Sequence, residues 1–209
     1  MLDSVMGAMP AVRRLQSMGA RALYRAGLDA DKATIAGAAL GIAAAIAFGA
    51  GALRLGLIAL AISAALDALD GTIAREYAAP SAIGGVFDLS SDRLVEIAVM
   101  IGIAWRRPEV YFPAFVLVGS WYVNITVFLA VGAALEGRGP KLIDYPPGIL
   151  ERTEALIFFA LLAAVEQSAA LRSLGPWLCY VLTVMEIATA IQRLRFGHRM
   201  LSRPAPPVS

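Results

Sequence analysis

Long apolar segments alternate with short polar connections along most of the chain. Each segment is close to the ~20 residues that an α-helix needs to cross the hydrocarbon core of a bilayer. The six segments are residues 33–53, 55–75, 84–105, 110–135, 150–169 and 173–194. This pattern predicts an all-α integral membrane protein with six transmembrane helices, and we assign residues 29–196 to that single domain.

The residues on either side of this domain differ in pattern. Residues 1–28 combine four arginines with apolar residues at helical spacing, which is typical of an amphipathic helix in the membrane interface. Residues 197–209 are basic and rich in proline. We therefore expect the six transmembrane helices to be preceded by an interfacial amphipathic helix and followed by a cytoplasmic tail.

Composition and charge agree with a membrane location. Hydrophobic residues make up 59% of the 209 residues, whereas soluble domains are nearer ~45–50% apolar. Most lysines and arginines fall on the side that holds both termini and the second and fourth connections. By the positive-inside rule we expect a protein of the cytoplasmic (inner) membrane with both termini in the cytoplasm. Membrane lipid, and not nucleic acid, is the expected surrounding partner.

Four aspartates interrupt the second and third segments. Asp67 and Asp70 share one helix face at a spacing of three, and Asp88 and Asp92 share one face of the next helix at a spacing of four. A single charge at a helix centre in a bilayer costs at least ~2.5–3.5 kcal/mol, so four of them indicate a functional site. Carboxylates that converge across two helices can hold hard divalent cations, and without His or Cys nearby they favour Mg²⁺ or Mn²⁺.

The aspartates belong to a longer pattern, D-x2-D-G-x2-A-R-x8-G-x3-D-x3-D. This pattern resembles the signature of the CDP-alcohol phosphotransferase (CDP-alcohol phosphatidyltransferase) family, class I. Every fixed position is filled, and the matching residues are Asp67, Asp70, Gly71, Ala74, Arg75, Gly84, Asp88 and Asp92. The resemblance implies an enzyme that transfers the phosphatidyl or a related group from a CDP-lipid, such as CDP-diacylglycerol, to the hydroxyl of a small alcohol and releases CMP.

The resemblance also implies roles for the carboxylates. Asp67, Asp70 and Asp88 would bind two divalent metal ions, Mg²⁺ or Mn²⁺, that bridge the diphosphate. Asp92 would complete this metal site and serve as the catalytic base for the acceptor hydroxyl. The signature begins late in one segment and ends early in the next, so we expect the active site to face the cytoplasm.

The nucleotide and its phosphates would lie against the remaining signature residues. Gly71, Ala74 and Gly84 are small and let a nucleotide approach the backbone, and the fork of Arg75 suits a phosphate. Thr34 lies outside the signature and is a weaker nucleotide candidate, because hydroxyl residues are ordinary in packed membrane helices.

The acceptor end of the reaction is less clearly marked. Glu151-Arg152-Thr153-Glu154 and Gln192-Arg193 are similar to elements of the phosphatidylinositol-phosphate synthase branch of this family. In that branch the arginines bind the phosphate of the acceptor. Arg152 and Arg193, with Lys141 and Arg93 as helpers, are therefore our candidate acceptor-binding residues.

Two departures from that branch leave the acceptor open. The second arginine of its first element is Ala155 here, and Asn124 and Thr126 stand in the fourth segment where the branch carries basic residues. The acceptor is therefore either a phosphorylated inositol or another small alcohol. Two further carboxylates lie in the segments: we expect Glu186 to be structural and leave Glu96 as either a structural or a pocket residue.

An alternative of another class is a non-catalytic cation-binding membrane protein or transporter. It predicts polar residues along several segments, whereas the first, fourth and sixth segments are nearly all apolar. The family resemblance therefore takes precedence, and it adds the expectation of a homodimer, since members of the family are commonly dimeric.

Overall fold

The computed structural model describes residues 9–77, 81–136 and 152–202, and these residues form helices and their connections without a strand. The elements are α2 (Pro10–Arg25), α3 (Ala30–Gly49), α4 (Leu53–Tyr77), α5 (Ala82–Ala104), α6 (Pro108–Glu136), α7 (Arg152–Gln167), the 3₁₀ turn η1 (Arg172–Leu174) and α8 (Gly175–Leu201). The all-helical class predicted from the sequence is confirmed.

Local sequence signals explain where several helices begin. The side chain of Asp29 accepts a hydrogen bond of 2.9 Å from the backbone N–H of Lys32 and caps α3. Hydrogen bonds from the Lys32 side chain and backbone also hold the pKa of Asp29 below its usual value. Ser81 caps α5 through a 3.0 Å bond from the N–H of Gly84. Gly51, with a φ of 82°, allows the tight turn from α3 into α4.

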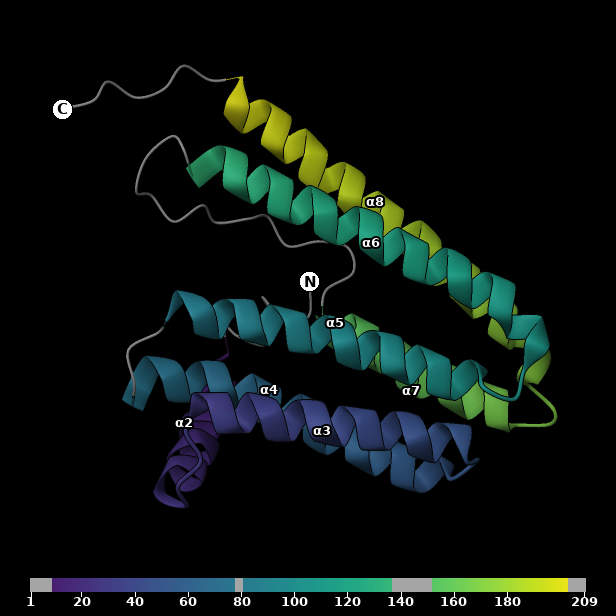
Figure 1. The fold of residues 1–209 in the computed structure, drawn as a ribbon, viewed down its shortest axis with the longest axis horizontal. Coiled ribbons are helices and arrows are strands. Elements are labelled where there is room, and N and C mark those ends of the chain that lie inside the picture. Colours follow the sequence, from purple (N-terminus) through teal and green to yellow (C-terminus); the bar gives the residue numbers. More distant parts are fainter. Residues whose placement is uncertain (1–8, 78–80, 137–151, 203–209) are drawn as a thin grey trace.

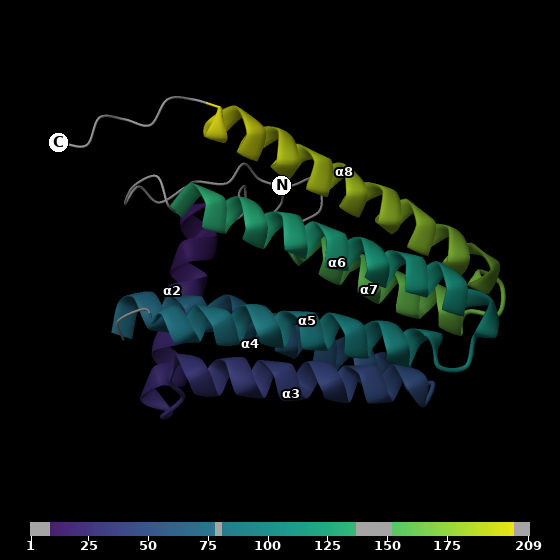
Figure 2. The same cartoon turned by 45° about the horizontal axis from the view of Figure 1, so that its top comes forward.

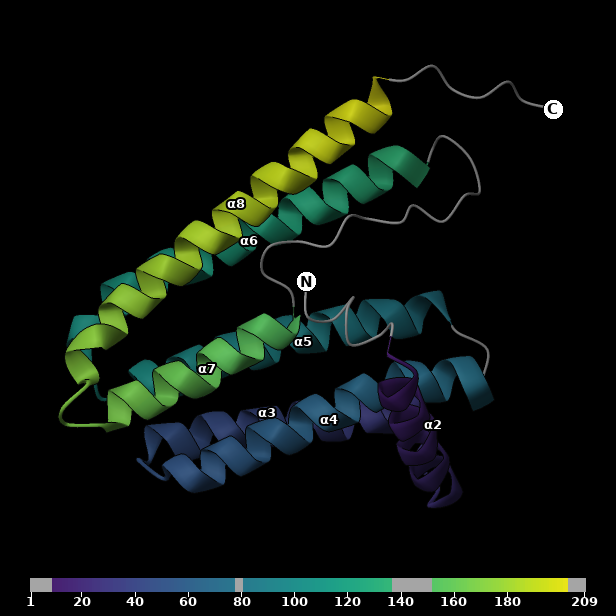
Figure 3. The same cartoon turned by 180° about the vertical axis from the view of Figure 1, so that it is seen from behind.

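The long helices lie beside one another, and successive helices run in opposite directions along the long axis of the molecule (Figure 1). Helices α3, α4 and α5 pack together on one side, and α6 and α8 form a long pair on the other side. Figure 3 shows α7 between these two groups. The chain alternates direction, so α4 ends, α5 begins and α8 ends at the same end of the bundle. This end gathers the polar side chains described below.

Helix α2 has a different orientation from the rest. It runs across the bundle instead of along it (Figure 2) and packs against the end of α4. The rings of Tyr24 and Tyr77 stack with centroids 4.7 Å apart, and Ala20 is buried with Ile73. An N-terminal helix perpendicular to the bundle has the geometry that an interfacial helix requires.

The α3–α5 contact depends on a glycine. A Cβ on Gly102 would overlap the backbone of Ala45, so the two helices approach closely at this point. Small residues that allow such approach are typical of helix packing in membranes. Around this contact the main core contains buried side chains from α3, α4, α5, α6, α7 and α8.

Four helical segments of the described chain are long and apolar enough to cross a membrane. They are Ala30–Gly49, Leu53–Tyr77, Pro108–Leu135 and Arg172–Leu201. The protein is therefore an integral membrane protein, but the count of six spans is not reached. Two reasons account for the difference: α5 carries four charged residues from Asp88 to Glu96, and α7 has only 16 residues.

Candidate active site

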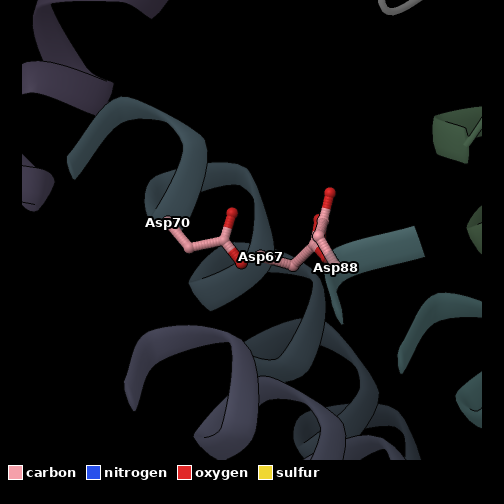
Figure 4. Close-up of side chains that lie close together, drawn as sticks. All are labelled: Asp67, Asp70 and Asp88. Carbon is pink, nitrogen blue, oxygen red and sulfur yellow. The ribbon is translucent and has the colours of Figure 1, made fainter. Parts of the chain in front are cut away.

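Three of the four predicted metal ligands converge at the end of the bundle where α4 gives way to α5. Asp67 and Asp70 lie on α4 and Asp88 lies on α5, and each offers a carboxylate oxygen within 4.8 Å of the other two. Figure 4 shows the three side chains directed toward one another. Asp70 is buried, and the other two are partly buried. The helix spacing of three brings Asp67 and Asp70 to one face of α4, and α5, which runs antiparallel to α4, adds Asp88.

The surroundings of these carboxylates fit a divalent cation. Thr34 of α3 donates a 2.6 Å hydrogen bond to Oδ2 of Asp70 and fixes that side chain. The Oδ1 atom of Asp88 is buried and accepts no hydrogen bond from the described residues. An unsatisfied carboxylate oxygen beside two more carboxylates is unfavourable unless a cation lies between them. Oxygen ligands without His or Cys suit Mg²⁺ or Mn²⁺.

A cavity of about 320 Å³ opens beside this cluster, lined on one side by Asp70 and Asp88. All five residues predicted to bind nucleotide or phosphate line it: Thr34, Gly71, Ala74, Arg75 and Gly84. Their side chains come from α3, α4 and α5, so the tertiary fold brings together residues that are up to 50 positions apart.

The small residues leave this cavity open. A Cβ on Gly71 would meet only the guanidinium of Arg75, at 3.2 Å from Nη1, and would otherwise project toward the cavity. Arg75 is exposed and donates a 3.2 Å bond to the hydroxyl of Thr72. Its head is therefore near the cavity mouth, where it can reach a phosphate.

Some residues of this cavity were not predicted to bind substrate. Asp29, Asp31 and Ser81 had no role in the predicted site, yet all three line the cavity. The available signal was positional, because a residue that caps the start of α3 or α5 lies at the same end of the bundle as the metal cluster.

Asp92 lies one helical turn beyond Asp88 and does not belong to the group of three. It lines a narrow cavity of about 40 Å³ together with Asp67 and Glu96. The predicted quartet is therefore divided: Asp70 and Asp88 line the larger cavity, whereas Asp67 and Asp92 line the narrow one.

A third cavity, of about 160 Å³, lies between α5, α6, α7 and α8. Its charged and polar lining includes Arg93, Glu96, Asn124, Glu186 and Arg193. It shares Glu96 and Ala155 with the narrow cavity of Asp92. We call this cavity the α5–α8 cavity.

Hydrogen bonds and ion pairs hold the polar side chains of the α5–α8 cavity. Nη1 of Arg193 donates a 2.8 Å bond to Oδ1 of Asn124, and Nδ2 of Asn124 donates to Oε2 of Glu186. Arg93 forms a 2.6 Å ion pair with Glu96. The acceptor candidate Arg193 lines this cavity, and so does Glu186, which was expected to be structural.

The other two acceptor candidates are Lys141 and Arg152. Lys141 is outside the described residues, and Arg152 is described only in its backbone, as the first residue of α7. Ala155, one turn further along α7, contributes to the α5–α8 cavity.

Comparison with known proteins connects this geometry to one family. The sequence profile described as CDP-alcohol phosphatidyltransferase matches residues 29–191. The phosphatidylinositol phosphate synthase of Mycobacterium tuberculosis (strain ATCC 25618 / H37Rv) is 32% identical over 197 residues, which cover 88% of this chain and 86% of the relative. The archaetidylinositol phosphate synthase of Pyrococcus horikoshii is 35% identical over 146 residues, covering 67% and 71%.

Solved structures show the same fold. The crystal structure of the Mycobacterium tuberculosis phosphatidylinositol phosphate synthase with CDP-DAG bound superposes with a TM-score of 0.73 at 26% identity, covering 92% of this chain and all of that chain. The structure of the same enzyme in complex with manganese and citrate gives a TM-score of 0.72 at 26% identity, covering 91% and 93%.

Proposed function

We propose a reaction geometry for this chain from one premise: it belongs to the CDP-alcohol phosphatidyltransferase family. It is accordingly a membrane transferase of phospholipid synthesis that moves the phosphatidyl group from a CDP-lipid to a small alcohol and releases CMP. Divalent metal binding, Mg²⁺ or Mn²⁺, is part of this family's chemistry. The alternative of a non-catalytic cation-binding protein is not retained.

The donor end of the reaction belongs in the 320 Å³ cavity. The observation that carries this proposal is the cluster of three carboxylates, two of which, Asp70 and Asp88, line the cavity that every predicted nucleotide residue also lines. Asp67, Asp70 and Asp88 would hold two divalent cations, which would neutralise the diphosphate and favour departure of CMP. The cytidine would lie along Gly71, Ala74 and Gly84, with Thr34 at the base of the cavity.

The acceptor end belongs on the other side of Asp92. An alcohol in the α5–α8 cavity would reach Asp92 through the narrow cavity that contains Glu96. The carboxylate of Asp92 accepts the proton of the attacking hydroxyl. The hydroxyl oxygen bonds to the phosphorus that carries the lipid, and the bond from this phosphorus to the bridging oxygen of CMP breaks. The products are the phosphodiester lipid, CMP and one proton.

A phosphorylated inositol is the second candidate acceptor. The relatives named above are phosphatidylinositol phosphate and archaetidylinositol phosphate synthases, and Arg193 lines the α5–α8 cavity. With Arg152 and Lys141 it would provide the positive charge that a phosphate requires. Ala155 and Asn124 stand where that branch carries basic residues. Because both are uncharged, these two departures argue against this acceptor.

The membrane arrangement is part of the proposal. We place six helices, α3 to α8, across the bilayer and α2 along its cytoplasmic surface, with both termini and the metal cluster on the cytoplasmic side. The perpendicular setting of α2 supports this arrangement (Figure 2). A homodimer is the expected oligomeric state by analogy with the family.

Release of CMP from CDP-diacylglycerol in membrane vesicles tests the reaction, with and without small alcohols. We expect release that depends on an alcohol, stops in excess EDTA and returns with Mg²⁺ or Mn²⁺. Asp88→Ala should abolish the release, whereas Glu109→Ala, which removes an exposed carboxylate far from the cluster, should not. Full activity in excess EDTA would contradict the metal site, and release that never depends on an alcohol would contradict the transfer.

A further inference from the structure

The charges in the α5–α8 cavity indicate what kind of acceptor it binds. We infer that this acceptor is an uncharged polyol and not a phosphorylated or otherwise ionised alcohol. The inference rests on the proposed function, because it takes this cavity as the acceptor site.

The first observation is the balance of charge. Among the described residues that line the cavity, Arg93 and Arg193 carry positive charge, and Glu96 and Glu186 carry negative charge. In the described part of the lining, two cations therefore face two anions. The closest pair is Arg93 with Glu96, at 2.6 Å, in surroundings that leave only 15% of the Glu96 side chain exposed.

The second observation is that the remaining arginine is held by other side chains. Arg193 donates to Oδ1 of Asn124, and the guanidinium lies 4.9 Å from the centre of the Phe128 ring. The other end of the Asn124 amide donates to Glu186. Asn124 and Glu186 are both buried. The amide thus connects Arg193 to a carboxylate, and the orientation of the guanidinium is set by this connection.

The consequence for a phosphorylated acceptor is unfavourable. A phosphate monoester carries about 1.5–2 negative charges at neutral pH. To bind it, the cavity would have to accept this charge beside Glu96 and Glu186, or withdraw Arg93 or Arg193 from its partner. Leaving a buried carboxylate without its partner is costly.

A polyol matches the same lining without disturbing it. Each hydroxyl can donate to a carboxylate oxygen and accept from a guanidinium or amide N–H. Glu96, Glu186, Arg93 and Arg193 present both kinds of group to the cavity. Several hydroxyls on one small carbon skeleton would therefore each find a partner, while a neighbouring hydroxyl reaches toward Asp92.

The test uses two pairs of acceptors, and the two members of each pair differ only in a phosphate. CMP release is measured in vesicles with myo-inositol against inositol 1-phosphate, and with glycerol against glycerol 3-phosphate. We expect kcat/KM for the uncharged member to exceed that of its phosphorylated partner by ~10-fold or more in at least one pair, because only the uncharged member leaves the ion pairs intact. Preference for the phosphorylated member in either pair would overturn the inference.

Two variants test whether the charge balance sets this preference. Glu186→Gln removes one negative charge while it keeps the shape and the bond from Asn124, and Ala155→Arg adds a positive charge to the same cavity. Both should shift the preference toward the phosphorylated acceptor. The matched controls are Glu109→Gln, a carboxylate loss at the other end of the bundle, and Ala155→Leu, added bulk without charge, and neither should shift the preference.

Failure of the inference can be distinguished from failure of the proposed function. If both variants and the wild type keep the same preference between paired acceptors, the cavity charge does not select the acceptor, although the transfer itself stands. If no alcohol of either pair increases CMP release while calorimetry still shows binding of CDP-diacylglycerol, the proposed acceptor site is wrong, and the inference with it.

Discussion

At the scale of single residues, Asp88 and Asp92 are separated by one helical turn yet lie in different cavities. Asp88 faces the 320 Å³ cavity with Asp70, and Asp92 faces the narrow cavity with Asp67 and Glu96. Two carboxylates on one helix face can therefore hold different roles, one toward the cations and one toward the acceptor.

This separation predicts different effects of the two isosteric amides. Asp92→Asn keeps one carbonyl oxygen but accepts no proton at neutral pH, so CMP release should fall by ~10²–10⁴ while CDP-lipid and metal binding stay near those of the wild type. Asp67→Asn should lose metal and CDP-lipid binding together. Calorimetric titrations beside turnover measure both effects. Equal loss of binding in the two variants would make Asp92 chiefly a metal ligand, and Glu96 the next candidate base.

Gly71 provides a second prediction at this scale. Its added Cβ would meet only the flexible Arg75 head, so the fold should accept a side chain there, while the cavity should not. Gly71→Val should raise KM for the CDP-lipid or stop CMP release, and should leave KM for the alcohol unchanged in any residual activity. The purified variant should remain monodisperse. Wild-type kinetics would show that the glycine serves packing alone.

At the scale of elements, α5 connects every part of the proposed reaction. It carries Asp88 at the metal cluster, Asp92 in the narrow cavity, and Arg93 with Glu96 in the α5–α8 cavity. Its other end packs closely on α3 at Gly102. The polar half of α5 is therefore positioned by the apolar half.

The α3–α5 contact can be tested with two glycines. Gly102→Ala places a methyl group where the backbone of Ala45 lies, and this overpacking should cost about 1–3 kcal/mol of stability. Gly119→Ala on α6 adds the same group where no atom lies within 4 Å, so it should be neutral or slightly stabilising. Thermal unfolding of both variants in detergent measures the difference. Similar unfolding temperatures would show that α3 and α5 separate at little cost.

At the scale of the whole molecule, the two ends of the bundle differ in character. One end holds the metal cluster and the 320 Å³ cavity beside it. At the other end, Arg107 forms ion pairs with Glu166 of α7 at 2.5 Å and Glu109 of α6 at 2.8 Å. It also donates to the backbone carbonyl of Glu166. One arginine thus joins the start of α6 to the end of α7 at the end of the bundle away from the metal cluster.

The two ends should lie on opposite sides of the membrane. Cys179 is the only cysteine, so a Cys179→Ser background allows single cysteines to be placed at exposed positions. Arg14→Cys on α2 and Ser202→Cys after α8 should react with a membrane-impermeant thiol reagent from the cytoplasmic side. Arg106→Cys, between α5 and α6, should react from the opposite side. Labelling of all three from one side would contradict the six-span arrangement.

The local sequence determined the chemistry of the donor site. Asp67, Asp70 and Gly71 lie within five positions, and their spacing places them on one helix face whatever the rest of the fold does. The same holds for Asp88 and Asp92 on the next helix. Five predicted nucleotide residues line one cavity because four of them belong to these two helices, which are consecutive in the chain.

Only the tertiary structure decided the acceptor end. Asn124 on α6 is hydrogen-bonded to two residues of α8: Glu186, 62 positions away, and Arg193, 69 positions away. No helical period relates residues on α6 to residues on α8. The sequence therefore indicated Arg193 and took Glu186 as structural, whereas the packing of α6 on α8 joins both through one amide. The helix period fixes which side chains share a face, and the packing of distant helices fixes which faces meet.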